Sequence, residues 1–162
     1  MARSAEGKTN VMRVLDQKKI SYAAHTYPHE EGAAVDGVTV AKSMGQDPAR
    51  VFKTLVTQGA SKAYYVFDIP VAEALDLKKA ARAVGEKSIA MIHQKDLLGL
   101  TGYVHGGCSP IGMKKQFPTV LDETALAHDT IVVSGGKIGF QVELSPADLL
   151  SLVRGKTADL TV

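Results

Sequence analysis

The 162-residue chain has a single cysteine, Cys108, and a net charge of only +2. One cysteine cannot form an intramolecular disulfide bond, which fits a reducing cytoplasm. The sequence has no apolar run of the roughly 18 residues that a membrane-spanning helix requires. Its start, MARSAEGKTN, lacks the apolar core of a signal peptide. These absences predict a cytoplasmic protein that has no membrane-spanning segment.

The small net charge also excludes the uniform positive field of a strongly basic nucleic-acid-binding protein. Basic residues nevertheless gather at Lys18-Lys19, Lys78-Lys79, Lys114-Lys115 and Arg154–Lys156. Each cluster by itself is typical of a solvated helix face. If the fold brought several together, they would form a modest binding surface for a polyanion.

The composition, with 45% hydrophobic and 22% charged residues, is that of an ordinary globular protein. No repeat, low-complexity stretch or linker indicates a second domain. We therefore predict a flexible N-terminal tail over residues 1–8 and one domain over residues 9–162.

Helical and strand patterns are mixed along the chain without strict alternation. Helices are predicted from Thr9 to Lys19, over 38–45, over 71–85, from Gln94 onward and over 146–155. Strands are predicted over 22–28, 53–58, 62–70, 88–92, 119–123, 130–136 and 138–144. This mixture predicts an α+β fold, in which a single domain has a mixed, barrel-like β-sheet flanked by helices.

The only cysteine lies in a glycine-rich segment, YVHGGCSPIG, at residues 103–112. A catalytic thiolate needs a nearby base, and His105 lies three residues before Cys108. A lone cysteine in a tight loop can equally be a small apolar filler. The residues alone leave both interpretations open.

Glycines also occur in a second loop, SGGKIG, at residues 134–139. Neither loop has the pattern of a P-loop or of a dinucleotide-binding GxGxxG motif. The glycines serve either tight turns with positive φ or the close approach of backbone N–H groups to a ligand carbonyl or anion.

Lys53 stands in the apolar segment VFKTLV, where strand alternation directs its side chain to solvent or into a pocket. His25 and His29 are four residues apart, but Pro28 argues against the helix that would bring them to one face. No acidic or second cysteine ligand stands at a recognisable spacing, so we predict no metal site.

Three segments, VFKTLV, TGYVHGGCSPIGMKK and IVVSGGKIGFQVELSPADL, resemble in this order the YbaK family of free-standing editing proteins. Relatives of that family include the editing domain inserted in bacterial prolyl-tRNA synthetases. The resemblance covers nearly the whole chain. It implies an aminoacyl-tRNA deacylase that needs no cofactor and clears cysteine from tRNA(Pro), with Cys-tRNA(Cys) as a further candidate substrate. The implied partner is prolyl-tRNA synthetase, in a transient complex with the tRNA.

The resemblance also implies roles for particular residues. Lys53 and the backbone amides near Gly106 and Gly107 are the expected catalytic groups. The expected substrate-binding residues are Tyr27, Thr54, Ser109, Pro110, Gly112, Ser134, Gly135, Gly136 and Lys137. Many relatives have an aliphatic residue in place of Cys108, which disfavours a protein nucleophile. The implied nucleophile is the substrate cysteine's own thiol, which attacks its own ester carbonyl.

Three other functions are compatible with the sequence. A deacylase of the same fold could clear alanine or another small amino acid, since pockets discriminate weakly between small apolar groups. A non-catalytic module could bind aminoacyl-tRNA or a synthetase. A hydrolase could use Cys108 itself.

Overall fold

The computed structural model describes residues 7–29 and 35–162. Residues 1–6 of the predicted tail and residues 30–34 of the segment between the first strand and the next helix lie outside the described residues. The helices are α2 (Asn10–Gln17), α3 (Gly37–Ser43), α4 (Leu77–Val84), α5 (Gln94–Thr101) and α6 (Pro146–Val153). The strands are β1 (Ala23–Thr26), β2 (Phe52–Gly59), β3 (Tyr64–Pro70), β4 (Ile89–Met91), β5 (Thr119–Asp122), β6 (Ile131–Ser134), β7 (Phe140–Leu144) and β8 (Lys156–Ala158).

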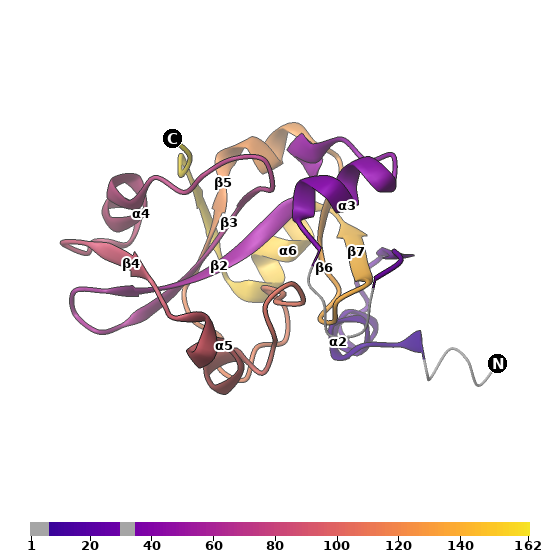
Figure 1. Ribbon diagram of the computed structural model, residues 1–162, viewed down its shortest axis with the longest axis horizontal. Coiled ribbons are helices and arrows are strands. Elements are labelled where there is room, and N and C mark those ends of the chain that lie inside the picture. The colour runs from indigo at the N-terminus through magenta and orange to yellow at the C-terminus, as the bar shows by residue number, and fades with distance from the viewer. Residues whose placement is uncertain (1–6, 30–34) are drawn as a thin grey trace.

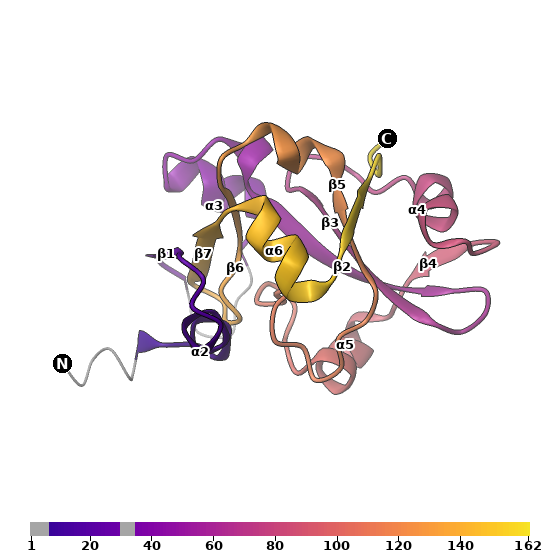
Figure 2. The same cartoon turned by 180° about the vertical axis from the view of Figure 1, so that it is seen from behind.

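The strands form two sheets that lie side by side (Figure 1). The smaller sheet has the order β1-β7-β6 and is antiparallel, and the larger has the order β4-β2-β3-β5-β8. The larger sheet is mixed, because β5 pairs in parallel with both β3 and β8. A bridge between Val51 and Val132 joins the two sheets, and α6 covers their junction on the face seen in Figure 2. The predicted α+β domain with a mixed sheet and flanking helices is confirmed.

Local sequence signals account for most element ends. Thr9 caps α2 by accepting a hydrogen bond from the Met12 N–H, and Ser145 caps α6, as predicted. The predicted helix over 71–85 was too long. It begins at Leu77, because the Asp76 side chain accepts hydrogen bonds from the Lys78 and Lys79 N–H groups. Strand β8 was not predicted.

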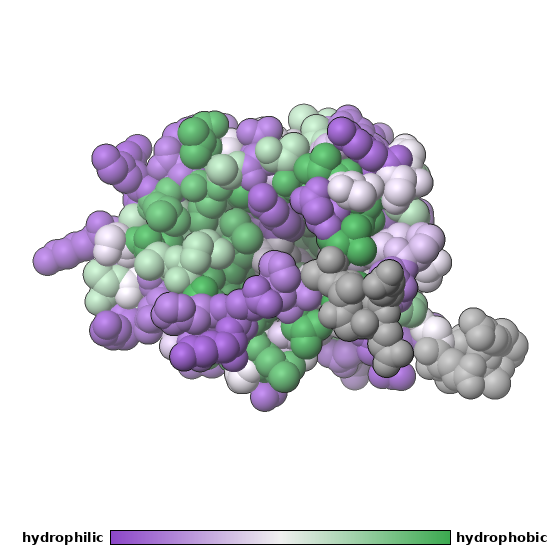
Figure 3. Space-filling model, in the orientation of Figure 1, coloured by the Kyte–Doolittle hydropathy of each residue, from purple (hydrophilic) through white to green (hydrophobic). Residues whose placement is uncertain are grey.

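Two clusters of buried side chains stabilise this arrangement. The larger one fills the space between the two sheets and includes Val56 and Val66 from one sheet and Val133 and Val142 from the other. The smaller one lies between α4 and the other face of the larger sheet. Figure 3 shows hydrophobic side chains gathered on the molecular surface over this second region. Partly buried Leu55 packs against the second cluster from the edge of the sheet.

The two glycine-rich loops pack against each other. A Cβ atom at Gly107 would lie 3.0 Å from the backbone nitrogen of Ile138 and 3.1 Å from the backbone carbons of Lys137. These contacts are tighter than almost all real Cβ contacts, so a side chain at position 107 would require the opposite backbone to shift. Gly106 itself has a φ of +88°, a conformation that side-chain-bearing residues avoid. The glycines therefore serve both a tight turn and the contact between the loops.

Two carboxyl groups are buried in the larger sheet and differ sharply in their partners. Asp122 accepts hydrogen bonds from the Leu160 N–H and from both the N–H and the hydroxyl of Thr124. Asp68 accepts one, from the Thr54 hydroxyl at 2.5 Å, and its Oδ2 atom has no partner among the described residues. Burial raises the pKa of Asp68 to about 7, against the opposing effect of the Thr54 hydrogen bond.

Replacing Gly107 by alanine should destabilise the protein by about 1–3 kcal/mol, because the new methyl group presses on the opposite loop. The matched control is Gly99→Ala in α5, where nothing lies within 4 Å of the new Cβ. That variant should be about 0.5–1 kcal/mol more stable than wild type. Chemical denaturation of both variants tests this, and equal effects at the two glycines would contradict it.

The stability of the protein should also decline with pH because of Asp68. Its folded-state pKa is raised, so the favourable contribution of the neutral carboxyl is complete below about pH 4 and is lost as the pH rises to about 7. The decline should be of the order of 4 kcal/mol. Urea denaturation should show it in wild type but not in Asp68→Asn. Parallel pH dependences in the two proteins would show that Asp68 has an ordinary pKa.

Candidate functional site

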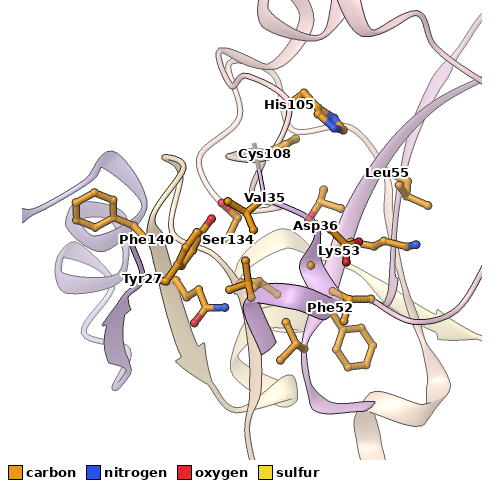
Figure 4. Close-up of a pocket in the computed structure, with 18 of the residues that line it drawn as sticks. Tyr27, Val35, Asp36, Phe52, Lys53, Leu55, His105, Cys108, Ser134 and Phe140 are labelled. Atoms are coloured by element: carbon orange, nitrogen blue, oxygen red, sulfur yellow. The ribbon is translucent and has the colours of Figure 1, made fainter. Parts of the chain in front are cut away.

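A cavity of about 490 Å³ opens where the two sheets meet. It is bounded by β2, by the facing ends of β6 and β7, by the start of α3 and by the loop that contains Gly106. Figure 4 shows Tyr27, Phe140 and Ser134 on one side, Lys53 and Leu55 on the other, and His105 at the glycine loop. Its volume lies within the range of small-molecule sites, about 300–1,000 Å³.

Strand β2 contributes four consecutive residues, Phe52 to Leu55, to the wall of this cavity. Successive side chains of a strand point to opposite faces, so a cavity on one face would receive only every second one. Strand β4 pairs with β2 only at Thr57–Gly59, so it does not cover the edge of β2 beside these residues. The cavity therefore reaches both faces around this edge.

The structure brings five of the predicted site residues together. Tyr27, Lys53, Thr54, Gly106 and Ser134 all line the cavity. The lining does not include Gly107, Ser109, Pro110, Gly112, Gly135, Gly136 or Lys137. These residues lie in the two glycine loops that support the cavity wall, where Ser109 and Pro110 are buried and Lys137 is exposed. Their contact with a substrate stays a prediction.

Backbone hydrogen bonds hold the cavity residues in place. The Tyr27 N–H donates to the Gly139 carbonyl at 2.9 Å, which ties the end of β1 to the second glycine loop. In that loop the Ser134 hydroxyl oxygen accepts from the Gly136 N–H at 3.1 Å. In the first loop the Gly107 N–H donates to the Val104 carbonyl at 3.0 Å. The Gly107 amide therefore closes a turn, and Gly106 is the glycine of this loop that reaches the cavity.

Cys108 also lines the cavity but lacks the properties of a nucleophile. Its side chain is buried, and burial together with the charge of Asp68 raises the pKa of the thiol to about 12. A thiol with this pKa is protonated at neutral pH, whereas nucleophilic cysteines have lowered pKa values. The structure supports the interpretation of Cys108 as an apolar filler.

Sequence reasoning missed several lining residues. Asp36, which lines the cavity, caps α3 by accepting a hydrogen bond from the Thr39 N–H. Its position directly before a helical pattern is the sequence signal that could have identified it as a cap. Phe140 and Gln141 begin β7, and nothing in their local sequence distinguishes them from other strand residues. Asp68 lies behind the cavity wall, and its position in an apolar strand segment did not indicate its hydrogen bond with Thr54.

Residues 7–29 and 35–162 offer neither a metal site nor a membrane-spanning helix. They contain no group of three or more histidine, cysteine, aspartate or glutamate side chains that could hold a metal ion. His25, one of the two histidines considered above, bonds instead to Glu143 at 2.8 Å. Within the same residues, every helix is too short or too polar to cross a membrane.

The chain is similar to known proteins over a range that includes most of the cavity-lining residues. Residues 29–152 match the aminoacyl-tRNA editing domain. A protein of Enterococcus faecalis named as a candidate Cys-tRNA(Pro)/Cys-tRNA(Cys) deacylase, EbsC, is 46% identical over 159 residues, which cover 98% of this chain and 96% of the relative.

Solved structures agree with this match. One, described as a candidate trans-editing enzyme for prolyl-tRNA synthetase, is 25% identical with a TM-score of 0.78, over 99% of this chain and 96% of that one. Another, the hypothetical protein APE2540, shows the same fold at 19% identity with a TM-score of 0.84, over 95% of this chain and all of that one. Because the domain match covers most of the cavity-lining residues and most of the chain, the protein belongs to the aminoacyl-tRNA editing domain family.

Proposed function

We propose that the protein is a free-standing deacylase that clears cysteine from mischarged tRNA(Pro), with Cys-tRNA(Cys) as a second substrate. The near full-length identity of 46% to a relative with this name supports the substrate. The proposed place of action is the cytoplasm, beside prolyl-tRNA synthetase in a transient complex with the tRNA. A second enzyme is needed because a site built for proline cannot reject cysteine by size.

The observation that carries the proposal is a cavity with binding groups but no activated nucleophile of its own. Lys53 supplies a cation, Thr54 a hydroxyl and Gly106 a backbone amide. The cavity thiol, Cys108, is protonated at neutral pH because its pKa is about 12. The Ser134 hydroxyl oxygen accepts a hydrogen bond from the Gly136 N–H, and no base among the described residues is bonded to it. This set of groups suits a substrate that brings its own nucleophile.

In the proposed reaction, the sulfur of the cysteinyl group attacks its own ester carbonyl. The C–S bond forms, the C–O bond to the terminal ribose breaks, and the thiol proton is transferred in exchange for one on the leaving ribose oxygen. The products are a cyclic thioester and a tRNA with a free terminal hydroxyl. An amino acid without a thiol has no such route, so selectivity arises from chemistry as well as fit.

The protein's contribution to this reaction is position and electrostatics. We assign the Gly106 amide to the oxygen that becomes negative in the transition state, where one lost donor costs about 100–1,000-fold in rate. Gly107 holds this amide in place through its packing against Lys137 and Ile138. Lys53 is assigned to the ribose, phosphate or carbonyl of the substrate, and Tyr27 to the pocket wall.

Lys53→Ala should lower the rate of Cys-tRNA(Pro) deacylation by about 10–100-fold, because it removes a charged hydrogen-bond donor from the substrate. Release of labelled amino acid from Cys-tRNA(Pro), Ala-tRNA(Pro) and Pro-tRNA(Pro) measures this. Wild type should act on the cysteinyl substrate alone. Lys87→Ala, which removes an equal charge from an exposed loop outside the cavity, should match wild type.

Several outcomes would contradict the proposal. Equal rates for Lys53→Ala and wild type would remove Lys53 from the reaction. Preferential release of alanine would assign the protein to the alternative function of clearing small residues without a thiol. No release from any substrate would favour a binding module.

Cys108→Ala should retain at least a tenth of the wild-type activity, because the reaction uses the substrate's thiol. The same deacylation assay tests this, with treatment of wild type by a thiol alkylator as a second measurement. A loss as large as that of Lys53→Ala would make Cys108 the nucleophile.

A further inference from the structure

Asp68 is a buried acidic group beside the cavity that the proposed reaction does not use. It lies opposite Thr54 in the antiparallel register of β2 and β3. The Ile92 N–H donates to the Val56 carbonyl, so the backbone of Val56, and by alternation that of Thr54, points away from β3. Thr54 and Asp68 therefore form a non-hydrogen-bonded pair, in which facing side chains come closest.

The side chains of this pair are bonded to each other. The Thr54 hydroxyl donates to Asp68 Oδ1 at 2.5 Å, within the range of about 2.5–2.7 Å for a hydroxyl bonded to a carboxylate. Asp68 is fully buried, and its Oδ2 has no partner among the described residues. Buried polar atoms without partners are rare in proteins because they are costly, so each one calls for an explanation.

Thr54 connects this carboxyl to the cavity, since Thr54 lines the wall and Asp68 lies behind it. A hydroxyl has one proton to donate and two lone pairs. While the Thr54 proton is held by ionised Asp68, the hydroxyl can only accept a hydrogen bond from the cavity side. Protonated Asp68 can donate to Thr54 instead, and the hydroxyl proton is then released toward the cavity. The protonation of Asp68 thus sets the direction of the Thr54 hydroxyl.

We propose that ionised Asp68 is a positioning residue for deacylation, which holds the Thr54 hydroxyl as the acceptor of a hydrogen bond from the substrate's thiol. This inference rests on the proposed function, because it requires a cysteinyl substrate in the cavity. The bond would fix the thiol in one rotamer within the pocket. The change in Asp68 charge falls near neutral pH, because its pKa is about 7.

The surroundings of Asp68 contain few groups that could imitate this effect. The ionisable residues on the neighbouring strands and in the glycine loop are Lys53 on β2, Asp122 on β5, and His105 and Cys108 in the loop. Burial and the Thr54 hydrogen bond are the causes of its raised pKa. Cys108, with a pKa of about 12, stays neutral throughout the range in which Asp68 titrates.

The test is the single-turnover rate of Cys-tRNA(Pro) deacylation from pH 5.5 to 8.5 in wild type and Asp68→Asn. The thiol and amino group of the substrate also titrate, but they do so identically for both enzymes. The ratio of the wild-type rate to the variant rate should rise with pH up to about pH 7 and level off above it. A ratio that does not change with pH would overturn the proposal and leave Asp68 a purely structural role.

Thr54 provides a matched pair of variants that leave Asp68 in place. Thr54→Ser keeps the hydroxyl and should keep the pH dependence of wild type, whereas Thr54→Val should lose it. Adding Asp68→Asn to Thr54→Val should cause no further loss of deacylation rate, because both changes remove the same Thr54–Asp68 hydrogen bond. Additive losses would overturn the proposal. The comparison of Thr54→Ser with Thr54→Val alone decides the matter if Asp68→Asn does not fold.

Failure of this inference can be told apart from failure of the proposed function. If wild type releases no cysteine at any pH, the proposed function fails. If wild type releases cysteine but the ratio to Asp68→Asn is flat, only the role of Asp68 fails.

Discussion

The antiparallel register of β2 and β3 is the constraint on which the cavity depends. It places Thr54 opposite Asp68 and Lys53 opposite Ile69. A slip of one residue would turn every side chain of β2 to the other face. Val56 would then leave the larger core cluster, and the Thr54 hydroxyl would lose the carboxyl that orients it. Burial of the apolar residues thus also fixes the geometry of the polar ones. Strand β4 does not pair with β2 over Phe52–Leu55, and these four consecutive residues line a single cavity.

Features that depend on neighbouring residues were predictable from the sequence. The capping side chains of Thr9 and Ser145 identified the starts of α2 and α6, because a cap acts within three residues of its own position. The β2–β3 hairpin was likewise visible as two apolar strand patterns around a short turn. Strand β8 was not visible, because three residues form no pattern and their only partner, β5, lies more than thirty residues earlier. The start of α4 was misplaced because an apolar pattern continued ahead of the Asp76 cap.

The candidate site was predictable only in part, for a related physical reason. The resemblance to an editing family pointed to Tyr27, Lys53, Thr54, Gly106 and Ser134, which the fold brings together in one cavity. Composition could not show that the two glycine loops pack on each other, since the contact of Gly107 with Ile138 joins residues about thirty positions apart. It could not show Asp68 either. In the sequence, the aspartate of YYVFDIP only interrupts an apolar strand pattern. Its hydrogen-bond partner, Thr54, lies on the neighbouring strand and is brought next to it only by the fold.

The position of Asp68 affects the stability of the protein, its selectivity for a thiol-bearing substrate and the pKa of its own thiol, Cys108. Its neighbours on the same face of the sheet, Val56 and Val66, are apolar, and a valine at position 68 would avoid the cost of a buried carboxyl. The ionised carboxyl orients Thr54 toward an acceptor role and, through its charge, raises the pKa of Cys108. One buried group thereby favours a thiol that arrives with the substrate and keeps the protein's thiol neutral. In a cavity with this arrangement, a cysteine can line the wall without acting as a competing nucleophile.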